Sequence, residues 1–478
     1  MNTALGAAGE LAIQSLISKA PLASSLADDF RVEGYKLALV GGSVRDAILG
    51  RLSGDLDFTT SAPPEISRKI ISKWAQSVWD IGIAFGTVAG KKGDTTVEVT
   101  TYRSESYGDQ SRKPEVKYGG SIEGDLRRRD FTVNAMALEL TNGKPEFIDP
   151  YNGLRDLKDR ILRTPGTPQE SFSDDPLRML RAARFASQLN FALAPEVLLA
   201  MKEMAARISI VSPERVREEF SKLLLSNDPR TGISILVETG IADLILPEIP
   251  KLKLEIDEHH HHKDVYEHSL TVLEQAIALE ERLGGPNLVI RLAALLHDIG
   301  KPKTRNLIAG GGVSFHHHEV VGARQAKERL KALRYDGETI DAVTSLIALH
   351  LRFHGYGEGD WTDSAVRRYV RDAGELLIHL HVLTRADCTT RNKHKAATLA
   401  ATYQNLEERI ELLMQEEELL KMRPDIDGAQ VMRLLNLKPS RAVGDALEFL
   451  LELRIEQGPL GPEKAEQELL KWWAARAK

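Results

Sequence analysis

The segment GGSVRDAILGRLSGDLDF, residues 41–58, sets the architecture expected for the N-terminal part of this 478-residue chain. The apolar run before it, residues 37–40, predicts a short buried strand, and Ser43 is predicted to cap a helix over residues 44–49. Paired glycines let a ligand approach the backbone closely, while a helix N-terminus and Arg45 supply positive charge. The segment therefore predicts a phosphate-binding turn, with an ordinary strand–turn–helix as the alternative.

Three acidic residues in this region are candidates for metal binding and catalysis. Asp55 and Asp57 lie two residues apart in a predicted strand, so both carboxylates point to one face and can share divalent ions. Mg²⁺ prefers oxygen ligands, and two ions roughly 3.5–4 Å apart can hold the attacking and leaving oxygens of phosphoryl transfer. In the alternating stretch 95–100, Glu98 lies opposite two valines and is predicted to face the same cleft as a general base or further metal ligand. A chance acidic pair and a solvent-facing glutamate are the alternatives.

The segment RRRDFTVN, residues 127–134, is a candidate for binding phosphate. It places three guanidinium groups in a row, directly before apolar residues that indicate burial. Arginine grips phosphate oxygens through paired hydrogen bonds, so a triphosphate or an RNA backbone is the expected ligand. A solvated charge run is the alternative.

A second arginine-rich segment is DDPLRMLRAAR, residues 174–184. Asp175 and the proline after it predict a helix start. Arg178, Arg181 and Arg184 then cover one side of that helix, while apolar residues cover the other. This arginine face is predicted to present both a base reader and a phosphate clamp, and a purely structural helix is the alternative.

Taken together, four motifs resemble those of bacterial class II tRNA nucleotidyltransferases, the CCA-adding enzymes, whose sister family is bacterial poly(A) polymerase. The motifs GG-x-VRD, DxD, RRDFTxN and DDPLR occur in the family's order over residues 36–190. The resemblance implies an α+β fold, in which a DNA-polymerase-β-like nucleotidyltransferase head precedes all-α neck, HD and tail regions. It also implies that two carboxylates bind Mg²⁺ and that four residues contact the incoming nucleotide. These are Asp55 and Asp57 for the metal, and Gly42, Arg45, Arg128 and Arg129 for the nucleotide.

The resemblance further implies that CTP or ATP is chosen with no nucleic-acid template. In the family an acidic residue and an arginine mimic a base edge, and here these are Asp175 and Arg178. Aspartate supplies only acceptors and arginine only donors, so the pair matches the exocyclic amine and ring acceptor that cytosine and adenine share. GTP and UTP lack that amine on the relevant edge. The family often has Glu where this chain has Asp174.

Three more segments carry expectations about the first half of the chain. Residues 103–120 lack a hydrophobic period and are predicted to form a loop, a candidate lid over the site. Residues 149–154 predict a turn leaving the head, where the resemblance places a hinge. Residues 214–219 resemble the family's neck-stabilising motif, whose Glu–Arg contacts need not touch substrate.

A second group of potential metal ligands lies further along the chain. The doublet His297-Asp298 closes a buried apolar helix that glycine and proline stop. The candidates, in the order of an HD-type metal domain, are His268, His297, Asp298, His318, His350 and Asp387. This donor set suits Mn, Ni, Fe, Zn or Mg, and a metal-bound water can serve as a hydrolytic nucleophile. The resemblance to HD phosphohydrolases implies phosphatase or 2′,3′-cyclic phosphodiesterase activity, with a buried His–Asp hydrogen bond as the alternative.

Length and composition indicate a globular protein of several domains. The expected domains are a head over 1–160, a nucleotide-selecting and RNA-binding neck over 161–250, an HD domain over 251–395 and a helical tail over 396–478. The net charge of −6 argues against indiscriminate nucleic-acid binding, so contact with tRNA requires local basic clusters, of which 367–371 is a candidate.

Cysteine content and apolar runs bear on the compartment. Cys388 is the only cysteine, which excludes an intramolecular disulfide and fits a reducing cytoplasm. The N-terminus does not resemble a secretion signal, and no apolar run approaches the roughly 18–20 residues that span a bilayer. A cytoplasmic protein without a membrane partner is expected. The histidine run at 259–262 is expected to be a solvated loop.

These observations predict an enzyme that adds CMP and AMP to the 3′ end of tRNA, using CTP, ATP and Mg²⁺. Four alternatives remain open. A poly(A) polymerase would share the head motifs, and a related enzyme would add only part of the CCA end. An HD phosphohydrolase with an RNA-binding head, or a non-catalytic RNA-binding protein, would use the same segments differently.

Overall fold

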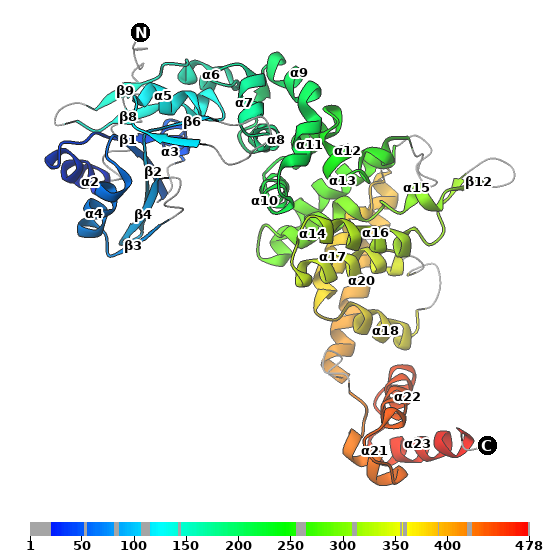
Figure 1. Cartoon of the computed structure of the whole chain (residues 1–478). Coiled ribbons are helices and arrows are strands. Elements are labelled where there is room, and N and C mark those ends of the chain that lie inside the picture. Colours follow the sequence, from blue (N-terminus) through cyan, green and yellow to red (C-terminus); the bar gives the residue numbers. More distant parts are fainter. Residues whose placement is uncertain are drawn as a thin grey trace. The chain divides into compact units, whose positions relative to one another are not determined.

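The computed structural model divides into two compact units, residues 1–245 and 246–478 (Figure 1). The residues it describes are 21–51, 55–80, 86–106, 115–141, 145–254, 264–307, 313–353, 356, 361–390, 392–417 and 423–476. The division falls close to the expected boundary between residues 250 and 251. The other expected boundaries lie inside the two units and remain predictions.

A seven-stranded sheet forms the centre of the first unit. Its strands follow the order β3-β4-β5-β2-β1-β8-β9, in which β2 and β5 pair in parallel and the other neighbours are antiparallel. Their bounds are β1 (Leu37–Val40), β2 (Asp55–Thr60), β3 (Ser77–Asp80), β4 (Thr87–Lys92), β5 (Thr95–Thr101), β8 (Ala137–Glu139) and β9 (Glu146–Ile148). The strands predicted at 37–40, around Asp55 and Asp57, and at 95–100 are confirmed, as is the mixed α+β character of the head.

Helices cover this sheet with amphipathic faces. α4 (Pro64–Trp74) buries Ile70, Ile71 and Trp74, which recur at the spacing of one helix face, and it packs against β4 and β5. α2 (Pro21–Val32) packs beside α4 and against β1 (Figure 1). The shorter elements α3 (Gly42–Ile48), α5 (Ile122–Arg127) and the 3₁₀ turn η2 (Thr132–Asn134) carry the sequence motifs.

Two local predictions for the head are wrong. Ser43 is not the N-cap of α3, because the helix begins at Gly42 and Gly41 occupies the cap position without a side-chain hydrogen bond. The segment 103–120 is not a simple loop, because β6 (Arg103–Ser106) pairs antiparallel with β7 (Glu115–Tyr118). The centre of that segment, and with it the lid hypothesis, lies outside the described residues, as does the histidine run at 259–262.

The rest of the first unit is helical and is organised around α8 (Leu177–Leu189). This helix packs against α10 and α11 through a buried face of small apolar residues. It starts close to the predicted position, since Asp175 Oδ1 accepts a hydrogen bond from the Leu177 amide at 3.1 Å. The surrounding elements are α6 (Gly153–Asp159), β10 (Ile161–Leu162), α7 (Pro168–Asp174), β11 (Ala192–Leu193), α9 (Pro195–Met204), η3 (Ala205–Ile210), α10 (Pro213–Leu224), α11 (Pro229–Glu238) and α12 (Ile241–Ile245).

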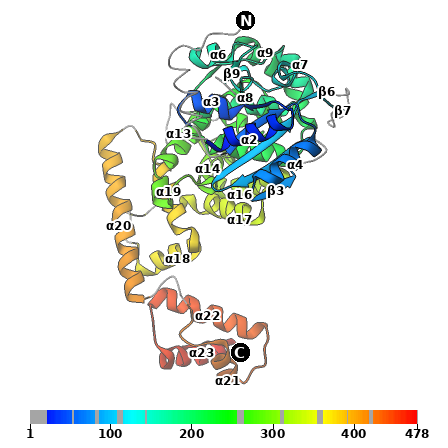
Figure 2. The ribbon, with the colours of Figure 1, turned by 90° about the vertical axis from the view of Figure 1, so that its left-hand side faces the viewer.

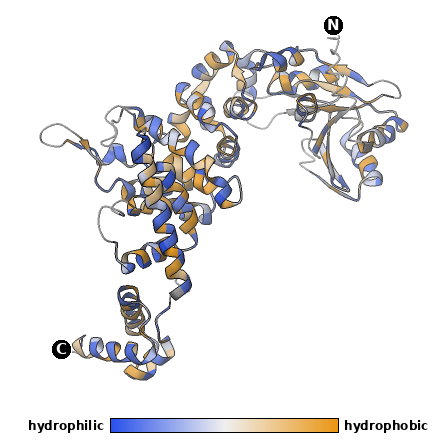
Figure 3. Ribbon diagram, turned by 180° about the vertical axis from the view of Figure 1, so that it is seen from behind, coloured by the Kyte–Doolittle hydropathy of each residue, from blue (hydrophilic) through white to orange (hydrophobic). Residues whose placement is uncertain are grey.

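The second unit begins with a bundle around α14 (Leu288–Leu296), whose sequence LVIRLAALL is apolar on nearly every side. Such a helix needs neighbours all round it. α14 packs against α13, α17 and α19, and Figure 3 shows hydrophobic residues gathered where these helices meet. The bundle elements are η4 (Pro250–Leu254), α13 (Val265–Ala278), η5 (Glu280–Leu283), α15 (Lys301–Thr304), β12 (Asn306–Leu307), β13 (Val313–Ser314), α16 (His318–Ala332), α17 (Gly337–Leu349), η6 (His350–Phe353), α18 (Asp363–Ala373), η7 (Gly374–Leu376) and α19 (Leu377–Asp387).

The unit ends with a long helix and a small helical group. α20 (Lys393–Glu417) contacts α18 and α19, and its length is plain in Figure 2. α21 (Gly428–Leu435), α22 (Arg441–Gln457) and α23 (Pro462–Arg476) share their own apolar core, which includes Val431 and Leu450.

The arginines of the basic cluster at 367–371 have structural partners within the second unit, and contact with RNA there remains a prediction. Arg367 is buried and donates to the Ile455 carbonyl oxygen. Arg368 and Arg371 form ion pairs with glutamates of α22 at 2.8 and 2.6 Å. These arginines therefore join α18 to α22.

Among the residues that the structure describes, no helix combines the length and the apolar character that crossing a membrane requires.

Candidate functional sites

Three carboxylates of the head lie together on one face of the sheet. Asp55 and Asp57 alternate with the buried Leu56 along β2, and the parallel register places Asp57 opposite Glu98 of β5. Partial desolvation raises the pKa of Asp57, and the Asp55 carboxylate adds to this against the opposing charge of Arg129. Desolvation, followed by the charges of Asp57 and Asp55, likewise raises the pKa of Glu98. The three groups therefore repel one another, and a cation between them would relieve that repulsion.

The glycine turn before α3 lies directly beside these acids. Gly41 has φ of 68°, a conformation that favours glycine, and a Cβ atom there would lie 2.9 Å from Arg129 Nη1. The Ser43 hydroxyl accepts a hydrogen bond from the Asp57 amide at 2.9 Å. The turn, the carboxylate strand and Arg129 are consequently held close together.

Two of the three adjacent arginines are held by one buried acid. Asp125 on α5 accepts hydrogen bonds from Arg128 at 2.6 Å and from Arg129 at 3.2 Å. Burial opposes ionisation of this carboxyl, but the two guanidiniums outweigh it and lower its pKa. Arg127 is more exposed and lies 3.8 Å from Glu170. Asp125 thus fixes the arginine pair that the family resemblance predicts to contact the nucleotide.

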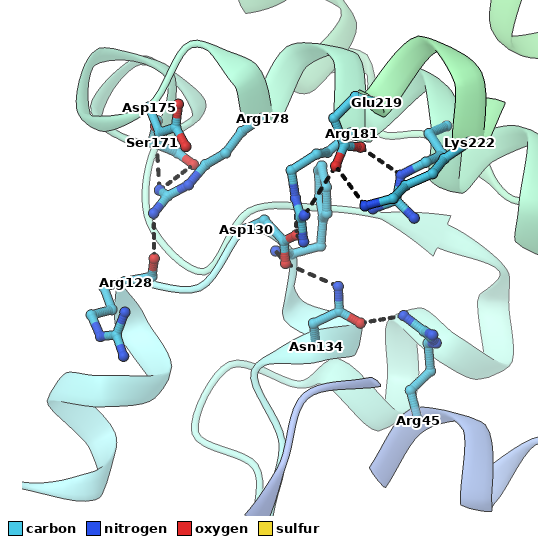
Figure 4. Close-up of polar contacts among 12 residues, drawn as sticks. Arg45, Arg128, Asp130, Asn134, Ser171, Asp175, Arg178, Arg181, Glu219 and Lys222 are labelled. Carbon is cyan, nitrogen blue, oxygen red and sulfur yellow. Dashed lines mark hydrogen bonds and ion pairs between the residues drawn. The ribbon is translucent and has the colours of Figure 1, made fainter. Parts of the chain in front are cut away.

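A chain of polar contacts links α3 to α8 and α10 (Figure 4). Arg45 Nη1 donates to Asn134 Oδ1 at 2.6 Å, and Asn134 Nδ2 donates to Asp130 Oδ1 at 2.9 Å. Asp130 Oδ2 accepts from Arg181 Nε at 2.8 Å. Asp46 also forms paired hydrogen bonds with Arg45, at 2.9 and 2.7 Å. Arg45 is therefore fixed beside the glycine turn by two neighbouring side chains.

Arg181 and Arg184 both reach the neck helix α10. Arg184 is 8 % exposed and donates to Glu219 Oε2 at 2.6 Å. Arg181 lies 3.5 Å from the same carboxylate (Figure 4). Arg215 pairs with Asp175 at 2.7 Å. Glu–Arg contacts from residues 214–219 therefore stabilise the neck, and Arg184 is placed in this packing rather than at a nucleotide surface.

A cavity of about 300 Å³ lies between α5, α7 and α8. Its lining includes Arg127, Arg128, Arg129, Ser171, Asp174 and Arg178. Arg178 Nη1 donates to Ser171 Oγ at 3.0 Å, and its Nη2 donates to the Arg128 carbonyl oxygen. Asp174, for which no role was predicted, also borders this cavity.

The six residues proposed as HD ligands meet at one place in the second unit. They come from the ends of five helices, and all are buried except the half-buried Asp387. Gly300 permits the closest approach, because a Cβ there would lie 2.1 Å from the His318 carbonyl oxygen. The residues group as His268, His297 and Asp387 on one side and Asp298, His318 and His350 on the other.

In each histidine of this cluster, the Nδ1 atom forms a hydrogen bond with an oxygen atom. The oxygens are backbone carbonyls for three of them, at 2.7–2.8 Å, and the Thr389 hydroxyl at 3.2 Å for His268. Carbonyl oxygens accept only from N–H, so three rings carry their proton on Nδ1 and leave Nε2 as a potential ligand. Outer hydrogen bonds of this kind orient metal-binding histidines.

Asp298 lies between the two ligand groups. Its Oδ1 is 3.2 Å from His318 Nε2, and its Oδ2 is 3.2 Å from His297 Nε2. Within the described part of the chain, Oδ2 accepts no hydrogen bond of good geometry, although the Lys301 ammonium lies 3.0 Å away. Burial disfavours protonation of His297, but Asp298 and Asp387 outweigh it and raise its pKa to about 10. The donor set of imidazole nitrogens and carboxylate oxygens fits divalent cations.

Comparison with known proteins identifies three family matches along the chain. Residues 37–163 match the family model for the poly(A) polymerase head domain, 190–252 the model for the probable RNA and SrmB-binding site of polymerase A, and 265–392 the HD domain. The A-adding tRNA nucleotidyltransferase of Deinococcus radiodurans is 34 % identical over 91 % of this chain and 95 % of its own length. The chain belongs to the tRNA nucleotidyltransferase family. The resemblance seen in the sequence is thereby confirmed.

Other members of the family match a smaller part of the chain at higher sequence identity. The CCA-adding enzyme of Streptococcus gordonii is 38 % identical over 52 % of this chain and 60 % of its own length. That of Levilactobacillus brevis is 44 % identical over 44 % of this chain and 51 % of its own length. The structure of the Bacillus stearothermophilus CCA-adding enzyme in complex with CTP shares the fold, with a TM-score of 0.66 at 24 % identity over 96 % and 98 % of the two chains.

Several residues of this nucleotidyltransferase were not predicted as part of its sites. Asp125 precedes Arg128 and Arg129 by three and four positions, a helical spacing from which its role could have been inferred. Asp130 and Asn134 stand inside a recognised motif and bond to each other, but their arginine partners, Arg181 and Arg45, lie 51 and 89 positions away. Thr389 meets His268 across 121 positions, so no local signal indicates it.

Proposed function

We propose that this protein adds CMP and AMP to the 3′ end of tRNA, with CTP and ATP as donors. The observation that carries the proposal is the face on which Asp55, Asp57 and Glu98 lie together beside the glycine turn and Arg129. Full-length similarity to a tRNA nucleotidyltransferase supports the substrate.

Each of the head residues has a different role in the proposed reaction. Asp55 and Asp57 would hold Mg²⁺, which usually takes one or two protein carboxylates together with substrate phosphates and there neutralises developing charge. Glu98 has a raised pKa and is suited to take the proton of the attacking 3′-hydroxyl. Arg128 and Arg129 are fixed by Asp125 and would grip the triphosphate as pyrophosphate leaves.

Base choice is proposed to take place at the cavity beside α8. Arg178 borders it and would donate to the ring acceptor shared by cytosine and adenine. Asp175 would accept from the exocyclic amine, although it is now paired with Arg215 and must be shared with or released from that partner. Gly42 and Arg45 would line the phosphate side, and Arg181 would act through its contacts rather than directly.

The test is the length of the product on two tRNA substrates. A transcript ending at the discriminator base and one ending in CC are incubated with CTP, ATP or both. CCA addition predicts two residues added to the first transcript with CTP alone, and three with both nucleotides. Absence of any extension by correctly folded protein would refute the proposal.

A second candidate is addition of the terminal A only. The relative that spans nearly the whole chain is named as an A-adding enzyme, which is the observation in its favour. In that case only the transcript ending in CC is extended, by a single residue with ATP. A long A tail would instead identify a poly(A) polymerase, so the same gel separates the three activities.

For the second unit we propose a phosphohydrolase centre in which these two groups of residues would hold two divalent cations, with Asp298 lying beside both groups. The two oxygens of Asp298 face different histidines, and the ligands divide into two groups of three. Bound cations of this kind lower the pKa of water and polarise a phosphoryl oxygen. Lys301, beside Asp298, would contribute positive charge toward a phosphate.

Metal analysis and hydrolysis test this second proposal. The purified protein should carry close to two equivalents of a transition metal after loading with Mn²⁺ or Ni²⁺, and RNA ending in a 2′,3′-cyclic phosphate should be opened. Asp298→Asn should lose both ions and the hydrolysis. Hydrolysis that persists in this variant would contradict the assignment.

A further inference from the structure

The RRDFTVN segment of the head is tied to α8 at two points. Arg178 Nη2 donates to the carbonyl oxygen of Arg128, and Arg181 Nε donates to Asp130 Oδ2 at 2.8 Å. Residues 178 and 181 lie about one turn apart on the helix, and 128 and 130 lie two apart in the segment. The helix that carries the proposed base reader is therefore fastened to the segment that carries the proposed triphosphate arginines.

Asp130 has no capacity left to bind a substrate directly. Its Oδ1 accepts from the Phe131 amide and from Asn134 Nδ2, both at 2.9 Å. Its Oδ2 accepts from both Nε and Nη2 of Arg181. A carboxylate offers about four acceptor positions, so all are used, and the residue is only 8 % exposed. Any effect of Asp130 on the reaction must pass through its neighbours.

The same contacts extend from Asp130 to the glycine turn. Asn134 accepts from Arg45 Nη1 at 2.6 Å (Figure 4). Phe185 of α8 lies under both guanidiniums, with its ring centroid 5.3 Å from Arg45 Cζ and 5.4 Å from Arg181 Cζ. A shift of α8 would thus disturb the turn through hydrogen bonds and through a shared aromatic contact.

We propose that Asp130 is a positioning residue that couples base selection on α8 to placement of the triphosphate in the head. The inference rests on the proposed nucleotidyl transfer. A base that satisfies Arg178 leaves α8 in place, and through Asp130 it leaves Arg45, Arg128 and Arg129 aligned. A base that fails displaces the helix and misaligns the α-phosphate. Discrimination then appears in the rate of transfer more than in nucleotide binding.

The test compares Asp130→Asn, Arg181→Gln and the double variant in steady-state incorporation of CTP and UTP into tRNA. Asp130→Asn keeps the shape of the side chain but removes the charge that holds Arg181. Its kcat for CTP is expected to fall about tenfold or more while KM changes less than about threefold. The preference for CTP over UTP should fall about tenfold, and the double variant should lose little more than either single one.

Conservative and control variants separate positioning from a general loss of structure. Arg181→Lys keeps the positive charge and should recover part of the lost preference. Lys202→Gln removes an exposed neck ion pair with Glu238, 2.8 Å long, and should leave both kinetic parameters unchanged. Thermal unfolding of every variant is measured alongside.

The outcomes decide the proposal in either direction. A rise in KM for CTP with kcat and preference intact, or strictly additive losses in the double variant, would overturn it. Should Asp130→Asn fail to fold, Arg181→Gln and Arg181→Lys decide by the same kinetic criteria. A wild-type protein that extends no tRNA would instead refute the proposed function, which the same assay reveals first.

Discussion

Asp57 on β2 lies directly opposite Glu98 on the parallel strand β5. Residues paired across parallel strands project to the same face, so the two carboxylates share one environment with Asp55. Desolvation is the first cause of the raised pKa values of Asp57 and Glu98, and mutual repulsion adds to it. This geometry supports the proposal that the head binds cations at these carboxylates and that Glu98 acts as the acid–base group beside them.

Replacing Asp57 by Asn is expected to reduce nucleotide incorporation by at least about a hundredfold, the scale on which loss of one electrostatic catalytic group acts. The substitution removes a proposed metal ligand but keeps the size of the side chain. The matched control is Asp94→Asn in the exposed turn between β4 and β5. Single-turnover incorporation of CTP measures both, and tRNA binding should survive in each. Equal activity of the two variants would contradict the metal assignment.

The response to Mg²⁺ should depend on pH in a defined direction. Because the folded state raises the pKa of Asp57 and Glu98, the stability linked to these groups is present at low pH and is lost as pH rises. Mg²⁺ binds the deprotonated carboxylates and reverses that loss. The increase in Tm on adding Mg²⁺ should therefore grow between about pH 5 and about pH 8. Asp57→Asn should flatten this dependence, and an unchanged dependence would count against it.

Acid should weaken the link between the head and α8. Burial opposes ionisation of Asp130, but Arg181 and Asn134 outweigh it and lower the pKa to about 2. A lowered carboxyl pKa gives stability that is present above the unfolded value and is lost as pH falls through the folded value. Wild type should exceed Asp130→Asn by about 2 kcal/mol near neutral pH. Urea unfolding should show this difference vanishing toward about pH 2.

The buried pair of the neck should matter more than an exposed pair nearby. Glu219→Gln leaves Arg184 buried without its charged partner, which is expected to destabilise the protein by about 3 kcal/mol. Glu238→Gln breaks the exposed pair with Lys202 and should change stability by less than about 1 kcal/mol. Chemical denaturation of both variants provides the comparison. A similar loss in each would show that Arg184 finds another partner.

Gly300 should be essential to the HD cluster although it binds nothing. A Cβ atom at this position would lie 2.1 Å from the His318 carbonyl oxygen, so Gly300→Ala must move α16 and with it His318. Metal content after loading with Mn²⁺ should fall while CTP incorporation by the head persists. Gly337→Ala is the control, because a Cβ there meets nothing within 4 Å. Full metal content in Gly300→Ala would exclude this packing.

Sequence reasoning located the secondary structure of the head where the pattern is local. The apolar run at 37–40 and the alternation at 95–100 fix strands because each depends on a few adjacent residues. Ser43 was misassigned, because a serine near a helix start usually caps it, whereas here its hydroxyl faces the amide of Asp57 across the neighbouring strand. That partner lies fourteen positions away and leaves no local pattern.

For the two sites as well, the sequence indicates which residue types take part but not which side chains they contact. The six proposed HD ligands could be named from their chemistry and order, and the fold brings all of them together. The arginine face of α8 was identified too, but its three guanidiniums have different roles. Arg178 borders the cavity, Arg181 holds Asp130, and Arg184 is buried against Glu219. Periodicity gives the side of a helix, whereas the partner depends on tertiary packing.

The hydrogen bond of the Ser43 hydroxyl has a consequence for the accuracy with which the enzyme selects a nucleotide. It accepts a hydrogen bond from the backbone of β2 and so links the strand that carries the acids to the start of α3, the helix that carries Arg45. An enzyme that works without a template has no second strand against which to check its choice of nucleotide. The accuracy of that choice therefore depends on how rigidly its own residues are held. In this protein the smallest of the hydroxyl side chains, that of Ser43, supplies one of the contacts that hold these residues in place.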